Sequence, residues 1–253
     1  MSFHIFSIGI LFNALTCGVV AASALALTIF IMKRLQRVSL AMQAYAWFWW
    51  FTALLWLPLA IRYLVVGVGY TGPWIRLIDI VVQMSICFTG PPLFYYLSLQ
   101  VFRSELLANA LSLASALLGI ISTWFLLQPN GISVHEVTFF SAEATANTTS
   151  LIIFFVEVSI ILACLLYDVV VRLRRWYQTG ASALPYEAMY SSAIVIYLII
   201  GSVDESKIIT DWPIVVFRLL YAGIFLFVYL TISQHDASGD YLVDDTASPG
   251  SYA

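Results

Sequence analysis

Charged side chains inside long apolar stretches are the residues of this chain best suited to do chemistry. Arg76 and Asp79 lie three positions apart in one such stretch, so a helix can present both on one face. Glu157 and Arg218 lie at similar depths in two later apolar stretches. An ionisable residue within a membrane span costs about 2.5–3.5 kcal/mol and usually faces the bundle interior, where it pairs.

These four residues predict a polar cavity that binds a small polar ligand or accepts protons. Structural ion pairs that tie helices together are the alternative explanation for the same residues. Four further charged residues are expected in the same, outer half of the bundle, namely Arg62, Asp204, Glu205 and Lys207. Arg62 and Lys207 can also be explained by snorkelling to the membrane surface. Asp168, at the opposite end of its apolar stretch, is expected to pair with nearby arginines.

The composition indicates that a lipid bilayer surrounds most of the chain. Of its 253 residues, 62% are hydrophobic and only 10% are charged, whereas a soluble domain carries about 25% charged residues. A membrane span needs roughly 20 apolar residues, and its backbone must be hydrogen-bonded internally, so each span is a helix. Seven stretches qualify, at residues 5–32, 43–66, 74–102, 105–127, 149–171, 186–203 and 213–233.

The basic residues predict how these spans are oriented. Seven of the eleven lysines and arginines fall in connections on one side, namely Lys33, Arg34, Arg37, Arg103, Arg172, Arg174 and Arg175. The connection over residues 128–150 contains none. Basic connections stay in the cytoplasm. The predicted fold is therefore an all-α integral membrane protein, a seven-transmembrane-helix bundle with its N-terminus outside and its C-terminus cytoplasmic, in a plasma or inner membrane.

Glycine and proline mark a candidate hinge in the third span. Gly90, Pro91 and Pro92 follow one another past its middle, and Pro58 lies inside the second span. Proline removes a backbone hydrogen bond and bends a helix. These positions are either hinges for switching or fixed bends that improve packing.

The chain divides into a transmembrane domain over residues 1–234 and a polar tail over residues 235–253. The tail carries Asp236, Asp240, Asp244 and Asp245 and no basic residue. Such a segment cannot bury apolar surface and is expected to be disordered by itself. It is either a solvated tail or a docking segment for a cytoplasmic protein partner.

Motifs for cofactors, metals and catalysis are not found in the sequence. Cys17, Cys87 and Cys164 all lie in apolar stretches, without a CxxC or Cys/His cluster, so no metal site is predicted. Phosphate-binding, dinucleotide-binding and zinc-protease motifs are missing too, and an enzyme is not expected. The net charge of −3 gives no reason to propose nucleic acid as a partner. Asn147 begins a glycosylation sequon that matters only in a eukaryotic secretory pathway.

The predicted topology resembles that of rhodopsins and seven-helix receptors. A retinal pigment needs a lysine in its last span, and residues 213–233 contain none, so retinal is not expected. No other cofactor is evident. Three functions are compatible with the sequence. The preferred one is a sensor or receptor-like protein that signals through a cytoplasmic or membrane partner. The alternatives are an accessory subunit of a larger membrane complex and a transporter or channel for small solutes or protons.

Overall fold

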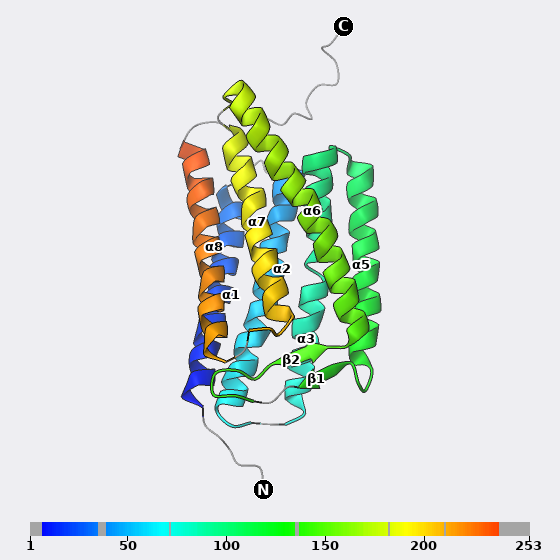
Figure 1. The fold of residues 1–253 in the computed structure, drawn as a ribbon, viewed down its shortest axis with the longest axis vertical. Helices are drawn as coiled ribbons and strands as arrows, with labels where there is room; N and C mark the ends of the chain where they lie inside the picture. The colour runs from blue at the N-terminus through cyan, green and yellow to red at the C-terminus, as the bar shows by residue number, and fades with distance from the viewer. Residues whose placement is uncertain are drawn as a thin grey trace.

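The computed structural model describes residues 7–34, 39–70, 72–134, 137–181, 183–209 and 211–237, so the predicted tail from residue 238 onward lies outside it. Across the described residues, seven helical segments are long and apolar enough to span a membrane. Successive segments run in opposite directions and pack side by side (Figure 1). The predicted all-α membrane bundle is confirmed at this level.

The elements of the bundle include one break, one π-helical turn and one small hairpin. In chain order they are α1 (Ile8–Arg34), α2 (Leu40–Gly67), α3 (Trp74–Cys87), α4 (Gly90–Leu97), the π-helix η1 (Ser98–Phe102), α5 (Glu105–Leu127), β1 (Ile132–Val134), β2 (Ala144–Ala146), α6 (Thr148–Thr179), α7 (Ala183–Glu205) and α8 (Trp212–Ala237). We call the end that holds β1 and β2 the hairpin end, and the opposite end the tail end.

Side-chain caps fix the starts of three helices. The side chains of Ser39, Ser104 and Asn147 each accept a hydrogen bond from a backbone amide in the first turn that follows. Asn147 also donates from Nδ2 to the Phe125 carbonyl at 3.0 Å. Both the oxygen and the nitrogen of the Asn147 side-chain amide are therefore hydrogen-bonded in this structure.

Helix α6 is longer than its apolar stretch predicted. The predicted span ended at residue 171, where the arginines begin, but the helix continues to Thr179 and projects beyond its neighbours at the tail end (Figure 1). It continues because Arg172 turns inward and pairs with Asp168 one turn earlier. Gly180, with φ of 68°, then ends the helix in the left-handed conformation that glycine adopts without strain.

The third span is interrupted where the sequence predicted a hinge. Helix α3 ends at Cys87, and the Thr89 hydroxyl donates back to the Ile86 carbonyl at 2.7 Å. Gly90 then begins α4, with Pro91 and Pro92 in its first turn, where proline costs no helical hydrogen bond. The interruption is confirmed; motion about it stays a prediction. Pro58, by contrast, lies within a continuous α2.

Aromatic side chains fill the centre of the bundle. Tyr197 of α7 lies edge-on to Trp49 of α2, with ring centroids 5.5 Å apart, and 5.1 Å from Tyr221 of α8. Tyr45 continues this column toward the tail end and lies 5.3 Å from the ring of Tyr96. Such pairs contribute about 0.5–1.5 kcal/mol beyond the burial of their area.

Apolar side chains also cover the outside of the bundle. Exposed examples from different helices include Leu15, Leu54, Leu117, Ile160 and Leu226. A surface of this kind needs lipid rather than water as its solvent. The protein is therefore a multi-pass membrane protein, with the bilayer as the partner of this surface.

A folded loop closes the hairpin end. Strands β1 and β2 pair antiparallel with Ile132 opposite Ala146, and the loop between them reaches the ends of α1 and α8. Asn13 of α1 donates to the Phe140 carbonyl at 2.8 Å, and Asp211 accepts from the Phe140 amide at 3.3 Å. The loop is thus tied to helices from both ends of the sequence.

Candidate functional site

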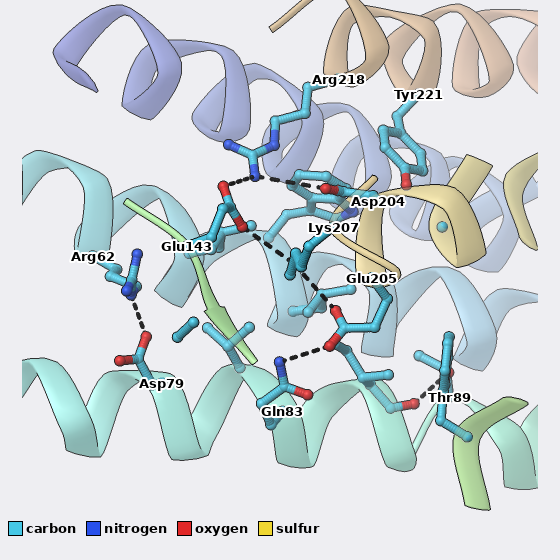
Figure 2. A pocket seen from close by; sticks show the side chains of 18 of the residues that line it. Arg62, Asp79, Gln83, Thr89, Glu143, Asp204, Glu205, Lys207, Arg218 and Tyr221 are labelled. Atoms are coloured by element: carbon cyan, nitrogen blue, oxygen red, sulfur yellow. Dashed lines mark hydrogen bonds and ion pairs between the residues drawn. The ribbon is translucent and has the colours of Figure 1, made fainter. Parts of the chain in front are cut away.

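A pocket lined by both charged and apolar side chains lies beneath this loop, between α2, α3, α7 and α8. Its volume is about 80 Å³, which is enough for several water molecules or a small solute. Seven charged residues line it, as Figure 2 shows: Arg62, Asp79, Glu143, Asp204, Glu205, Lys207 and Arg218. We call it the hairpin-end pocket.

The first wall of the pocket is an ion pair between α2 and α3. Arg62 Nε donates to Asp79 Oδ1, and both side chains are only 2% exposed. The remaining atoms of this pair, Arg62 Nη1 and Asp79 Oδ2, are buried without a hydrogen-bond partner. Arg62 does not snorkel to a surface, because a carboxylate on the neighbouring helix holds it inside.

Arg218 of α8 ties three other elements together at the centre of the pocket. Its Nη1 donates to Asn13 Oδ1 of α1 at 2.6 Å. Its Nη2 donates to the Tyr63 hydroxyl of α2 at 2.9 Å and to Glu143 Oε1 at 3.2 Å. The guanidinium carbon also lies 4.6 Å from the centroid of the Tyr63 ring, a cation–π distance.

Glu143 enters the pocket from the loop rather than from a helix. Besides Arg218, it accepts from the Tyr63 hydroxyl and pairs through Oε2 with Lys207 Nζ at 3.1 Å. Burial by itself would raise the pKa of Glu143, but Lys207 and Arg218 hold that pKa well below its usual value. The carboxylate is therefore an anion that anchors the loop over the helix ends.

Lys207 follows the end of α7 in an unusual backbone conformation. Its φ of 56° is left-handed, which is uncommon for a residue other than glycine. Burial opposes the charge of its ammonium group, yet the carboxylates of Glu205, Glu143 and Asp204 raise the pKa of Lys207 above its usual value. The cation is thus held in place by a ring of acids. Residues in rare backbone conformations cluster at ligand sites, where the surroundings over-determine them.

The acids of α7 complete the pocket. Glu205 Oε1 accepts from Gln83 Nε2 of α3 at 3.2 Å, and its Oε2 lies 3.5 Å from Lys207 Nζ. Asp204 Oδ1 lies 3.9 Å from Arg218 Nη2 and has no hydrogen-bond partner. The lining carries four acids and three basic residues, so its formal charge is −1. Within the described part of the chain, no group of three or more metal-ligating side chains is placed to hold a metal.

Two of the four residues predicted to share a cavity lie in this pocket and two do not. Asp79 and Arg218 line it. Arg76 is exposed and donates from Nη2 to the Gln128 carbonyl at the end of α5, at 2.8 Å. Glu157 is buried on α6, one turn deeper than Phe154, which lines the pocket. Asp79 pairs with Arg62 of α2 rather than with Arg76 of its own helix.

Glu143 is the residue that sequence analysis missed most clearly. It lies in a loop that had been expected to be extramembrane, and no local pattern marks an acid there as buried. Tyr63 and Gln83 lie inside predicted spans, and neither carries a charge that would mark it.

A second group of charges lies at the tail end, between η1, α6 and α7. Arg172 Nε donates to both carboxylate oxygens of Asp168 at 2.8 Å, Nη2 donates to Gln100 Oε1 at 2.8 Å, and Nη1 pairs with Glu187. Ser191 donates to Asp168 Oδ2 at 2.7 Å. We call these five residues the tail-end cluster. The expected pairing of Asp168 with an arginine is confirmed.

The aromatic column separates the two polar regions. Trp56, which lines the hairpin-end pocket, donates from Nε1 to the Tyr197 hydroxyl at 3.1 Å. At the other end of the column, the Tyr96 hydroxyl lies 3.5 Å from Ser191 Oγ of the tail-end cluster. Packed rings thus fill the space between the two ends of the bundle.

Comparison of the chain with models of protein families and with curated protein sequences finds no match. The function therefore has to be inferred from the geometry of the pocket and its surroundings.

Proposed function

We propose that the protein is a membrane sensor or receptor-like protein that binds a small polar solute in the hairpin-end pocket. Four buried polar atoms of pocket-lining residues carry this proposal, because none has a hydrogen-bond partner among the described residues: Arg62 Nη1, Asp79 Oδ2, Asp204 Oδ1 and Arg218 Nε. Buried polar atoms in proteins nearly always have a partner. A bound molecule that donates to the two carboxylates and accepts from the guanidinium nitrogens would give these atoms hydrogen-bond partners.

The charges of the lining favour a particular chemical class of solute. Two of the unpartnered atoms are carboxylate oxygens, two are guanidinium nitrogens, and the lining has a formal charge of −1. A solute with a cationic nitrogen and acceptor oxygens complements this pattern. The volume of about 80 Å³ favours a molecule of only a few non-hydrogen atoms, such as a small amino acid or amino alcohol.

The distribution of basic residues supports the direction from which the solute comes. Most lysines and arginines near helix ends lie at the tail end; Lys207 is at the hairpin end, where the connection over residues 128–150 has none. By the positive-inside rule, this distribution supports a cytoplasmic tail end and an N-terminus outside. The pocket then faces the outside of a plasma or inner membrane.

A route for the signal begins at the pocket wall. Thr89, at the interruption between α3 and α4, lines the pocket. Beyond it, α4 and η1 lead to Gln100 in the tail-end cluster. A solute that pulls on α3 would shift it relative to α4 and so disturb contacts on the cytoplasmic side, where a protein partner would respond. The filled aromatic column leaves no open path along it, which favours this function over a permanently open channel.

The test measures binding by thermal unfolding of the whole protein in lipid nanodiscs. The ligands are small amines, amino alcohols and amino acids, beginning with ethanolamine and glycine. We expect one of them to raise the unfolding temperature of the wild type, and to do so much less in Asp204→Asn. Arg76→Gln is the matched control, because Arg76 is a charged residue outside the pocket, and it should respond like the wild type.

Two results would contradict the proposed function. One is that no member of the panel changes the unfolding temperature of the wild type. The other is a stabilisation of equal size in the wild type and Asp204→Asn, because the solute would then bind elsewhere.

A further inference from the structure

Glu157 is a buried carboxyl that the hairpin-end pocket does not use. It lies in α6 and is 5% exposed. Among the described residues, no basic side chain forms an ion pair with it, and its Oε1 has no hydrogen-bond partner. It is therefore unlike the other buried acids of the bundle that have ion-pair partners, such as Asp79, Glu143 and Asp168.

Glu157 and Ser115 pack closely against Gly90 at the interruption of the third span. A Cβ atom added at Gly90 would lie 2.5 Å from Ser115 Oγ, 3.4 Å from Glu157 Oε2 and 3.5 Å from Glu157 Oε1. Only glycine at this position leaves room for both side chains. Ser115 Oγ is itself buried without a hydrogen-bond partner. Two unpartnered oxygen-bearing groups from α5 and α6 thus meet at the first residue of α4.

We propose that Glu157, Ser115 and the interruption at Gly90 form a proton-binding site inside the membrane, separate from the solute site. An isolated carboxylate in an apolar region is very costly, and binding a proton removes that charge. The protonated carboxyl also gains an O–H donor for a neighbouring oxygen. Ser115 supplies the hydroxyl that lies beside Glu157 at Gly90.

The other groups that face Glu157 do not provide a fixed counter-charge. From α3, the Cys87 thiol is close enough to interact with it electrostatically, and that thiol donates to Ser122 Oγ of α5 at 3.2 Å. Along α6, the buried positions on the same side toward the tail end are Ile161 and Leu165, both apolar. A ligand that neutralises Glu157 therefore has to be positively charged, as a proton is.

The hairpin-end pocket is the route by which a proton reaches this site. Phe154, one turn from Glu157 on α6, and Thr89, immediately before Gly90, both line the pocket. In the opposite direction, the next buried positions of α6 are apolar. Protons would enter from the hairpin end, and the charge on Glu157 would change beside the interruption between α3 and α4.

The experiment labels the wild-type protein in nanodiscs with dicyclohexylcarbodiimide, which reacts with protonated carboxyl groups in apolar surroundings. Labelled residues are identified by mass spectrometry after proteolysis, from mildly acidic to mildly alkaline pH, in sodium or choline buffer. We expect Glu157 to be modified, with modification decreasing several-fold as the pH rises and unchanged by sodium. Asp168, held by Arg172, is the internal control and should stay unmodified.

Three results would overturn the proton-binding site. Glu157 could stay unmodified at every pH, or it could be modified equally at every pH, which would make it a permanently neutral structural residue. Protection by sodium would assign the site to a metal cation instead. The wild-type measurement needs no variant, and Glu157→Gln only checks the assignment. Arg76→Gln, whose charge lies outside the hairpin-end pocket, should label at Glu157 like the wild type. The labelling of Glu157 and the thermal response to amines are separate measurements, so the two sites can fail independently.

Discussion

The two ends of the bundle use the same types of residue with different results. At the tail end, Arg172 directs its donors to Asp168, Gln100 and Glu187, and no polar side-chain atom of this cluster is buried without a partner. At the hairpin end, seven charged residues line one pocket, yet four of them each keep an unpartnered buried atom, namely Arg62, Asp79, Asp204 and Arg218. A satisfied network joins helices, whereas an unsatisfied one beside a cavity has room for a ligand.

This difference explains why the number of charged residues in a span does not show whether they stabilise the fold or bind a ligand. Buried ion pairs add little net stability, because desolvation offsets the attraction, but breaking one leaves a costly isolated charge. The comparison therefore predicts that both ends are needed for stability, and that only the hairpin end responds to a solute.

The largest expected effect is the loss of Arg218. In Arg218→Gln, Glu143 keeps Lys207 but loses its second cation, and the contacts to Asn13 and Tyr63 are weakened. We expect a loss of about 3–5 kcal/mol in the free energy of unfolding, measured by titration with a denaturing detergent. Adding Glu143→Gln should recover part of the loss, because the isolated charge is then removed. An unchanged stability of Arg218→Gln would show that this network does not hold the fold.

The tail-end cluster should show a smaller effect, on stability alone. Asp168→Asn keeps an oxygen that can accept from Arg172 and Ser191 but removes the charge. We expect a loss of about 1–3 kcal/mol, with the solute-induced rise in unfolding temperature unchanged. If Asp168→Asn abolished the response to solute, the two ends would not be separable in the way proposed.

Acid should weaken the hairpin end through Glu143. Its pKa is lower in the folded protein than in the unfolded chain, so its stabilisation is complete above the unfolded value of about 4.3 and is lost as the pH falls through the lower folded value. The free energy of unfolding should therefore decrease below this pH in the wild type. Glu143→Gln should be less stable at neutral pH and show a shallower decrease. Identical pH profiles for the two proteins would contradict this role for Glu143.

The smallest effect on stability is expected for Asp204, with a clear effect on binding. Among the described residues its one ion-pair contact is 3.9 Å long, so we expect Asp204→Asn to change the free energy of unfolding by about 1 kcal/mol. The dissociation constant of the solute should rise at least about tenfold, which corresponds to about 1.4 kcal/mol. Calorimetric titration in nanodiscs measures it. A large loss of stability with unchanged affinity would make Asp204 a structural residue.

The sequence predicted the helices well and the pairing poorly, for physical reasons. Apolar length determines whether a segment spans a bilayer, so the seven spans could be read directly. Which charges meet depends on how each helix is rotated, and spacing along α3 could not show that Asp79 would face Arg62 while Arg76 faces α5. Glu143 depends on the path of a loop over distant helix ends, which leaves no periodic pattern in the sequence.

The most direct test of the proposed solute site is an experimental structure of the protein with its best-stabilising amine bound. We predict density for the amine in the hairpin-end pocket, within hydrogen-bonding distance of Asp79 Oδ2, Asp204 Oδ1 and Arg62 Nη1. The contrary result is a closed pocket in which these three atoms satisfy one another or bind only ordered water, with the amine located elsewhere.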